Sequence, residues 1–389
     1  MELTAVFPRR EYAKHLADYL LVPKPLQGRV RSGLFLASER GTGKTTFLRH
    51  DLLPALQAEG AEAVLIELGL GVNKDPAALV LAQLKALCKT GDTLASIYAQ
   101  TRKRLSNGDH PVDRAIDVKT PDGADLVTTV EAIIAQRRKS VVLVIDDVQT
   151  VVGSQAGREL MQTLKVARDA INGKADTPGW FMVVGVGSPE SLLREMTSGR
   201  SQPFLGALCD RLEPLGKAYV EWMVARWRHS PGLKLPDLAV LWAGFKALGQ
   251  RPLPWQNALE ILQSRTESVD QAFPIICDTW ARAAVDADIK EVQRLGKLAE
   301  AIFNGVVQGT TANGVYADEA LKSYARALGR GDEITKSQVQ KAVSKLVTAG
   351  VVMREANGSC VVTDPLLAKV WAERRSRPFA LSQSDADRL

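Results

Sequence analysis

Short apolar runs alternate with amphipathic segments from residue 32 to about residue 215. Uninterrupted apolar runs of four to six residues are typical of strands that are buried on both faces of a parallel sheet. The intervening segments have the three-to-four-residue periodicity of helices that cover such a sheet. The pattern therefore predicts an α/β fold, a parallel sheet with helices on both faces. The expected strands lie at 33–36, 63–68, 140–145 and 181–184.

The pattern becomes helical after residue 214, with Pro and Gly between the segments. A first helical set is followed, from about residue 295, by a second one that ends in two β-rich runs. The runs flank Ala356-Asn357-Gly358-Ser359, and Asn-Gly between such runs is a strong hairpin signal. Helices followed by a hairpin predict a winged helix-turn-helix. The segments concerned are 218–227, 237–248, 255–263, 334–349, 351–355 and 360–363.

Composition adds few constraints. With 46% apolar and 24% charged residues, the chain has ample material for a buried core, which excludes bulk disorder. The four cysteines form no Cys-x-x-Cys pair and the four histidines have no metal-like spacing, which excludes the usual zinc sites and favours a reducing compartment. The N-terminus lacks the order of a secretion signal, and no stretch approaches the ~18 apolar residues of a membrane span. We therefore expect a soluble, cytoplasmic protein without membrane contact.

A phosphate-binding loop is predicted directly after the first strand. Residues 41–46 read Gly-Thr-Gly-Lys-Thr-Thr, so that a strand, a glycine-rich loop and a helix start follow one another. The glycines let successive backbone N–H groups point at phosphate oxygens, Lys44 would neutralise the β- and γ-phosphates, and Thr45 offers a hydroxyl to Mg²⁺. Ser38 stands where the usual pattern has Gly, so we expect ordinary dihedral angles there. The alternative is a glycine-rich turn without a ligand.

Two carboxylates follow the third apolar run. The segment 141–149 places Asp146 and Asp147 after five apolar residues, where buried carboxylates are costly unless a cation or hydrogen-bond donors lie nearby. Asp146 would hold Mg²⁺ through water, and Asp147 would orient or deprotonate the water that attacks the γ-phosphate. Alternatively, the pair caps the next helix.

The two motifs together resemble the AAA+ ATPases and the related STAND nucleotidases, and Asp-Asp-Val-Gln at 146–149 is similar to the acidic motif of bacterial replication initiators. Segments 164–169, 187–189, 202–206 and 363–367 resemble the prokaryotic, archaeal-type ATPases that end in a winged helix. Only the two Walker motifs are specific. Many AAA+ proteins carry Asp-Glu where this chain has Asp146-Asp147, which leaves the hydrolysis rate open.

The resemblance implies a domain order. It comprises an N-terminal helical leader, an AAA+ nucleotide-binding domain, an all-α lid, a winged-helix domain and a tail. Within the AAA+ domain, residues 90–124 are dense in turn residues and are interpreted as an insertion. The expected boundaries are 1–31, 32–215, 216–293, 294–378 and 379–389.

The resemblance also implies three roles outside the Walker motifs. Ser188, at the tip of the strand expected beside the acidic one, would be sensor 1, although a turn cap is a competing interpretation. Arg211, with Arg200 second, would be the arginine finger that enters a neighbouring subunit of a homo-oligomer, unless it forms an ordinary surface pair. Arg251, in Gly-Gln-Arg-Pro, would be sensor 2 and contact the nucleotide, unless it merely pairs with a carbonyl at a helix end.

Basic residues are concentrated near the C-terminus. The whole chain has a formal charge of +6 and a pI near 9.1, which permits a polyanionic partner. Residues 318–377 carry 11 Lys/Arg against 7 Asp/Glu. In the expected recognition helix, Val339, Val343 and Leu346 form a core stripe. Off this stripe, Lys341 and Lys345 would contact phosphates and Gln338 base edges, with Arg354 on the wing. Winged helices also dock proteins, so a protein partner stays an alternative to DNA.

These observations favour an ATP-binding and ATP-hydrolysing AAA+ protein that uses Mg²⁺. Its nucleotide-dependent assembly would present the winged helix to DNA, in replication, transposition or the biology of mobile elements. The alternative is a STAND-type switch or scaffold that turns over slowly and signals through protein assembly. A third hypothesis is a transcription factor that binds DNA without ATP.

Overall fold

The computed structural model describes nine stretches of the chain, which folds into two compact units, Met1–Glu213 and Pro214–Leu389. The expected insertion at 90–124, the Asn357-Gly358 turn and the tail at 379–389 lie outside the described residues. The described residues are 6–22, 28–68, 75–87, 126–151, 154–227, 230–311, 314–329, 334–354 and 359–376.

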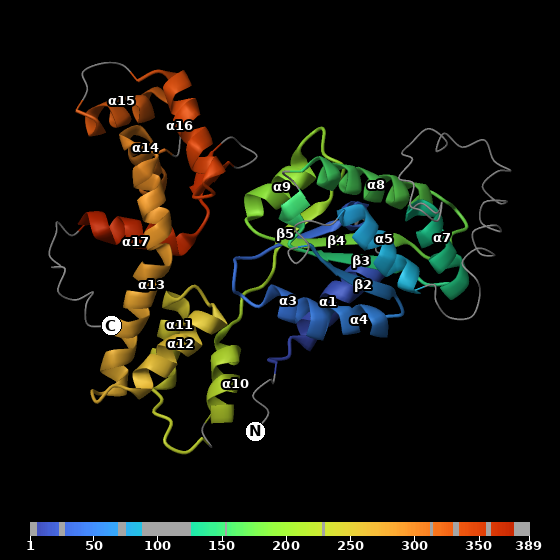
Figure 1. The fold of residues 1–389 in the computed structure, drawn as a ribbon, viewed down its shortest axis with the longest axis horizontal. Coiled ribbons are helices and arrows are strands. Elements are labelled where there is room, and N and C mark those ends of the chain that lie inside the picture. Colours follow the sequence, from blue (N-terminus) through green and yellow to red (C-terminus); the bar gives the residue numbers. More distant parts are fainter. Residues whose placement is uncertain are drawn as a thin grey trace. The chain divides into compact units, whose positions relative to one another are not determined.

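A five-stranded parallel sheet forms the centre of the first unit (Figure 1). Its order, β2-β3-β4-β1-β5, places β4 between β3 and β1 and so confirms the predicted neighbourhood of the acidic strand. Asp146 at the end of β3 is in register with Val186 of β4, and Ala37 at the end of β1 is in register with Gly187. The strands are β1 Leu34–Ala37, β2 Glu62–Glu67, β3 Val141–Asp146, β4 Phe181–Gly187 and β5 Leu208–Arg211.

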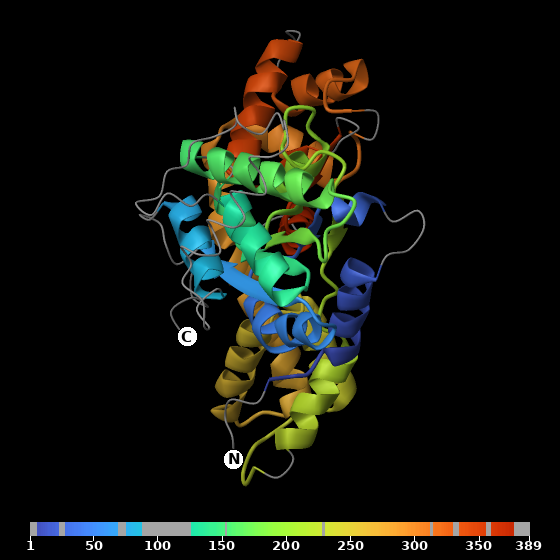
Figure 2. The same cartoon turned by 90° about the vertical axis from the view of Figure 1, so that its right-hand side faces the viewer.

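Helices cover both faces of this sheet, which confirms the predicted α/β class (Figure 2). Successive side chains of a strand point to opposite faces, so Leu143 and Ile145 enter one core while Val142 and Val144 enter the other. The first core is completed by α5, α7, α8 and α9, and the second by α1, α2 and the helical segment that follows β1. These helices are α1 Arg10–Leu21, α2 Gly28–Arg31, α3 Lys44–Phe47, α4 Leu53–Ala58, α5 Pro76–Leu87, α7 Leu126–Arg137, α8 Gln155–Asn172 and α9 Glu190–Ser198.

Strand β5 was not predicted. Its residues are Leu208, Cys209, Asp210 and Arg211, of which the first two are half-buried and the last two exposed. This strand has four residues, two of them charged, so it lacks the apolar run that predicted the other four strands. The backbone pairing with β1 therefore determines this element.

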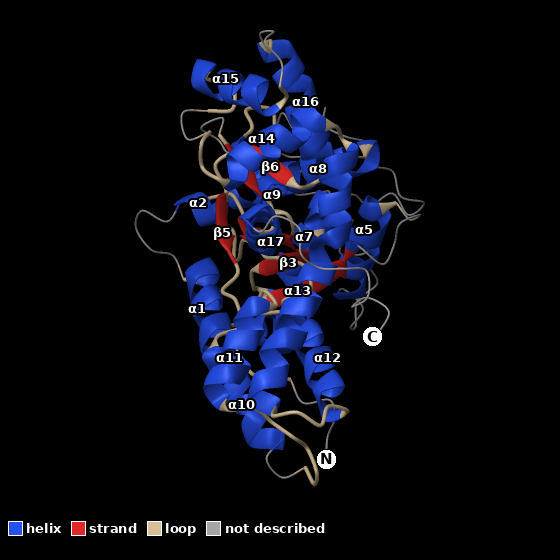
Figure 3. Cartoon of the chain, turned by 90° about the vertical axis from the view of Figure 1, so that its left-hand side faces the viewer, coloured by secondary structure: helices blue, strands red, loops and turns tan. Residues whose placement is uncertain are grey.

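The second unit is built mainly of helices, with one two-stranded antiparallel sheet, β6–β7 (Figure 3). Helix α13 is 26 residues long, and it packs against α11, α12 and α17. None of the described helices is long and apolar enough to cross a membrane. The elements are α10 Lys217–Trp227, α11 Leu238–Ala247, α12 Pro252–Gln263, α13 Val269–Arg294, α14 Lys297–Val307, α15 Asp318–Ala327, α16 Lys336–Thr348, β6 Val352–Arg354, β7 Cys360–Val362 and α17 Pro365–Ser376.

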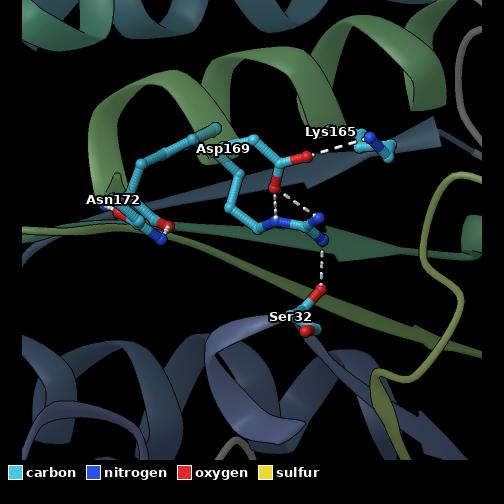
Figure 4. Close-up of polar contacts among 6 residues, drawn as sticks. Ser32, Lys165, Asp169 and Asn172 are labelled. Atoms are coloured by element: carbon cyan, nitrogen blue, oxygen red, sulfur yellow. Dashed lines mark hydrogen bonds and ion pairs between the residues drawn. The ribbon is translucent and has the colours of Figure 1, made fainter. Parts of the chain in front are cut away.

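A polar cluster fastens α8 to the amino ends of β1 and β4 (Figure 4). The Arg168 side chain is buried, donates twice to Asp169 Oδ1 at 2.9 and 2.6 Å, and donates to the carbonyl of Ser32. The Asn172 amide exchanges two hydrogen bonds with the backbone of Phe181, at 2.8 and 2.9 Å. These contacts hold the edge of the sheet opposite the loop that follows β1.

Replacing Arg168 by Met is expected to destabilise the first unit by about 1–3 kcal/mol, because the Ser32 carbonyl loses its donor and Asp169 loses its buried partner. Urea unfolding without nucleotide measures this change. Lys165→Met is the matched control: Lys165 binds the same carboxylate from an exposed position, so its loss should cost no more than about 0.5 kcal/mol. Equal effects of both variants would contradict the proposed importance of the buried contact.

The same cluster predicts a pH dependence. Burial alone would raise the pKa of Asp169, but hydrogen bonds from Lys165 and Arg168 outweigh it and hold that pKa below its ordinary value. A depressed carboxyl pKa contributes stability above the pKa of the unfolded chain, and this contribution is lost as pH falls through the folded pKa. The free energy of unfolding of the wild type should therefore exceed that of Arg168→Met by the full amount at neutral pH and by a smaller amount in acid.

Candidate functional site

The loop after β1 has the backbone geometry of a phosphate cradle. Gly41 and Gly43 have φ values of +78° and +89°, in the left-handed region that glycine adopts at little cost. A helical segment then runs from Lys44 to Ala58 with a π-helical stretch at Leu48–Leu52. The turn of the loop therefore delivers the chain into a helix start, as the motif predicts.

Ser38 has ordinary dihedral angles, as predicted. The non-glycine residues with positive φ in the described chain are Arg138, Asp147 and Gln250, so Ser38 is not among them. Its hydroxyl lies 2.6 Å from the Thr42 hydroxyl, which itself donates to the Glu39 carbonyl at 2.8 Å. Serine thus takes the place of the usual glycine without backbone strain and adds a cross-loop hydrogen bond.

Lys44 lies under this loop with 8% of its surface exposed. Its ammonium donates to the Glu39 carbonyl at 3.2 Å. Burial lowers the pKa of Lys44, and the nearby carboxylates of Asp147 and Asp146 partly counteract this. A buried ammonium near the loop is a positive charge that incoming phosphates would neutralise. Thr46, two residues further on, is exposed.

Thr45 and Asp146 meet although 101 positions separate them in the sequence. The Thr45 hydroxyl donates to Asp146 Oδ2, and Asp146 is 3% exposed. Burial raises the pKa of Asp146, the Thr45 hydrogen bond lowers it, and the charge of Asp147 raises it again. Hydroxyl and carboxylate oxygens suit Mg²⁺, and a cation would relieve the cost of burying this carboxylate. The donor set therefore fits the predicted metal.

A metal ion held by Thr45 and Asp146 would keep most of its bound water. Within the described stretches, no group of three or more His, Cys, Asp or Glu residues is placed to cage an ion. Mg²⁺ is commonly held by one or two protein oxygens, by water and by the phosphates of its substrate, so a cage is not required.

Asp147 has a left-handed backbone, with φ +53°. Its N–H donates to Asp146 Oδ1 at 2.9 Å, and its carbonyl accepts from the N–H and hydroxyl of Thr150 at 3.0 and 2.9 Å. Its carboxylate accepts from Gln149 Nε2 at 3.2 Å. The tight turn after β3 is therefore held by Thr150 and by Asp146, and the Asp147 carboxylate is held by Gln149.

Ser188 follows β4 and is joined to the same turn through its backbone. The Ser188 N–H donates to Gln149 Oε1 at 3.1 Å. The sequence interpretation assigned no role to Gln149, although its place two residues after Asp147 in the acidic motif was a usable signal. The sensor 1 role of the Ser188 hydroxyl stays a prediction.

The two candidate finger residues both lie on the first unit's surface. The Arg211 side chain is 73% exposed at the end of β5 and donates to Glu190 Oε2 at 2.5 Å. Glu190, at the start of α9, also binds Arg194. Arg200 is exposed in the turn after α9. The sequence interpretation missed Glu190, which anchors two guanidinium groups.

Arg251 lies in the second unit and has a carboxylate partner there. Its guanidinium donates to Asp364 Oδ2 at 2.8 Å, and Asp364 Oδ1 accepts from the Leu366 N–H at the start of α17. Arg251 thus connects the start of α12 with the start of α17. Its sensor 2 role stays a prediction.

Sequence comparison identifies part of the first unit. Residues 29–193 match the family model of the AAA domain, and no curated relative matches the chain. The matched range contains the loop after β1, both carboxylates and Ser188. The part of the first unit that matches the AAA domain model therefore contains the candidate site residues at the carboxyl edge of the sheet.

Comparison with solved structures finds a protein with the same architecture at a TM-score above 0.5. A Walker-type ATPase of Pyrococcus abyssi superposes with a TM-score of 0.55 at 16% identity, over 94% of this chain and 96% of that chain. The ORC2 protein of Aeropyrum pernix, in ADPNP and ADP complexes, has a TM-score of 0.48 at 14% identity, with coverage of 95% and 94%. At 16% identity, the similarity to the Pyrococcus abyssi ATPase shows the fold alone.

Proposed function

We propose that this chain binds ATP with Mg²⁺ and hydrolyses it. The observation that carries the proposal is the meeting of Thr45 and Asp146 beside the glycine-rich loop, with buried Lys44 nearby. Residues 41–46 would cradle the phosphates, Lys44 would neutralise their charge, and Thr45 and Asp146 would hold the metal. Bound Mg²⁺ would supply charge stabilisation on the β- and γ-phosphate oxygens.

Asp147 is the proposed residue for the attacking water. Asp147 follows the proposed metal ligand directly in the chain, has a left-handed backbone at φ +53°, and its carboxylate accepts from Gln149 Nε2. A carboxylate in this position would orient the water and accept its proton. Ser188, linked to the same turn, would sense the γ-phosphate as sensor 1.

We propose that copies of this chain assemble with one another, because the Arg211 side chain is exposed. A 73% exposed guanidinium at the carboxyl edge of the sheet is accessible to a second copy, and its Glu190 partner fixes its direction. In a homo-oligomer, Arg211 would then contribute positive charge to the neighbour's phosphates. Arg251 is proposed as the residue through which the second unit responds to nucleotide. It would give up its contact with Asp364 when it contacts the nucleotide.

The second unit is proposed to bind DNA through a winged helix made of α14, α15, α16 and β6–β7. Helix α16 buries Val339, Ala342, Val343 and Leu346, which confirms the predicted core stripe. Lys341 and Lys345 are exposed on its other side, and no ion pair engages either of them among the described residues. They would contact phosphates.

Two residues that were expected to contact DNA, Gln338 and Arg354, form hydrogen bonds within the second unit. Gln338 Oε1 accepts from the N–H of Thr335 in a capping box, so that this side chain serves the helix start rather than a base edge. Arg354 on β6 donates to the Tyr316 hydroxyl at 3.3 Å. On α17, Arg374 and Arg375 pair with Asp286 and Glu300. The DNA proposal therefore rests on the lysines of α16.

Lys341→Gln combined with Lys345→Gln is expected to weaken duplex DNA binding about 10-fold or more at moderate salt. Each lost phosphate contact should also reduce the slope of log affinity against log salt by about 0.9. Titrations with labelled duplex at several salt concentrations measure both quantities. Lys246→Gln combined with Lys290→Gln is the charge-matched control, because both lysines are exposed on α11 and α13, outside the proposed winged helix. Equal losses of DNA affinity in both double variants would mean that only the net charge matters for DNA binding.

One experiment tests the proposal as a whole: Mg²⁺-dependent ATP turnover with and without duplex DNA, combined with sizing in an ATP analogue, in ADP and with DNA. Turnover that rises with DNA and a larger assembly in the analogue are expected. Tight ATP retention with negligible turnover would instead favour a STAND-type switch that signals through protein assembly. Failure to bind ATP would overturn the proposal.

A further inference from the structure

Gln149 uses both ends of its side-chain amide, in the 3-10 turn Val148–Val151 directly after β3. Its Oε1 accepts from the backbone N–H of Ser188 at 3.1 Å, and its Nε2 donates to Asp147 Oδ1 at 3.2 Å. A backbone N–H only donates and a carboxylate only accepts, so a single orientation of the amide satisfies both partners. The side chain is therefore a directional bridge between the ends of β3 and β4.

The Gln149 side chain occupies the space that a side chain at Gly187 would need. A Cβ atom on Gly187 would lie 2.0 Å from Gln149 Oε1, far inside contact distance. The next atoms that it would meet are Gln149 Cδ at 3.2 Å and Leu193 Cδ1 at 3.4 Å. The absent side chain at position 187 thus leaves room for the amide. Because the clashing atom is the tip of a flexible side chain, an added methyl group would displace the bridge while leaving the strand in place.

The backbone of Asp147 is held separately from its carboxylate. Thr150 binds the Asp147 carbonyl through its N–H and its hydroxyl, and these contacts maintain the turn. Gln149 is the side chain that donates to the carboxylate itself in the described part of the chain. Loss of Gln149 would consequently release the carboxylate while the turn persists.

We propose that Gln149 is a positioning residue for ATP cleavage, which holds the Asp147 carboxylate and couples it to the end of β4. The inference rests on the proposed function, because it acts through Asp147. Gln149 occupies one oxygen of Asp147, which would leave the other oxygen to orient the water. The link to Ser188 makes the ends of the two strands respond together when the region around the γ-phosphate rearranges.

The test compares kcat and ATP affinity in full-length variants. Gln149→Met removes both hydrogen bonds at similar size, and Gln149→Glu keeps the acceptor for Ser188 but places a negative charge against Asp147. Both should lower kcat about 10-fold or more, because small misplacements of a catalytic group are costly, and change the ATP dissociation constant less than about threefold. Gly187→Ala should reproduce this phenotype by displacing the intact glutamine.

Thr150→Val is the matched control, since it removes a hydroxyl bond to the Asp147 carbonyl and leaves the carboxylate contact. It should keep kcat within about twofold of wild type. Melting temperatures and ATP binding establish that each variant is folded. A loss in Thr150→Val equal to that in Gln149→Met would assign the effect to turn stability and overturn the inference.

Asp147→Asn in the same assay separates the two levels of the proposal. Blocked cleavage in Asp147→Asn with normal kcat in both Gln149 variants would overturn the inference and leave the proposed function intact. Normal cleavage in Asp147→Asn, or no turnover by the wild type, would overturn the proposed role of Asp147, and the inference would fall with it. Loss of ATP binding in the Gln149 variants would also contradict a positioning role.

Discussion

Lys44→Ala is expected to abolish nucleotide binding, with a loss of affinity of at least about 100-fold. The lysine is 8% exposed, and its ammonium donates to the Glu39 carbonyl at 3.2 Å. Such a group is poorly satisfied without phosphate, and charge-assisted hydrogen bonds to the β- and γ-phosphates would replace this contact. Titration calorimetry with ATP and Mg²⁺ measures the change.

The free energy of unfolding should respond differently. Burial lowers the pKa of Lys44, which means that the fold disfavours its charged form. Lys44→Ala without nucleotide should therefore be as stable as wild type, or more so. Lys174→Ala, on an exposed lysine paired with Glu131, is the matched control and should bind ATP normally. Unchanged ATP affinity in Lys44→Ala would remove the assignment of the loop.

Asp147→Asn should leave ATP bound and reduce cleavage about 100-fold or more, the scale of a lost general base. Asparagine is nearly isosteric and also tolerates the left-handed φ of +53°, so the turn after β3 should persist. Gln149 Nε2 still finds an oxygen at this position. The substitution thus removes the charge and the proton acceptor while it keeps the geometry. Single-turnover cleavage of prebound ATP measures the chemical step apart from binding.

The exposed Asp176→Asn is the control for a lost negative charge, and it should cleave ATP at the wild-type rate. Asp147→Ala is a less informative variant, since alanine in a left-handed conformation adds about 1–2 kcal/mol of backbone strain. Normal cleavage by Asp147→Asn would show that a different residue handles the water. The Lys44 and Asp147 variants therefore separate binding from chemistry.

Features that depend on neighbouring residues in the chain were predictable. Strands β1, β2, β3 and β4 lie within a few residues of their predicted positions, because each contains the continuous apolar run that a strand covered on both faces requires. The buried stripe of α16 follows directly from its periodicity. The ordinary dihedral angles of Ser38 and the loop after β1 follow from the local cost of left-handed backbone.

Features that depend on a distant partner were not predictable. Gln149 carries no sign that its amide will meet Ser188, and Arg251 carries none that its carboxylate partner is Asp364. Likewise, nothing in the residues around Arg211 indicates its pairing with Glu190. Each case joins a polar side chain to one of many equivalent partners. Gln338 is a different case, because its capping box with Thr335 is a local contact that the sequence analysis did not consider.

The amino-acid order thus carries the class of fold, the phosphate loop and the acidic strand end, since each is written in residues a few positions apart that obey steric and burial rules. The folded chain adds the strand order β2-β3-β4-β1-β5, which brings Thr45 to Asp146 across 101 positions and Gln149 to Ser188 across 39. Polar groups select partners by distance and direction in space, and these exist only after the sheet has assembled.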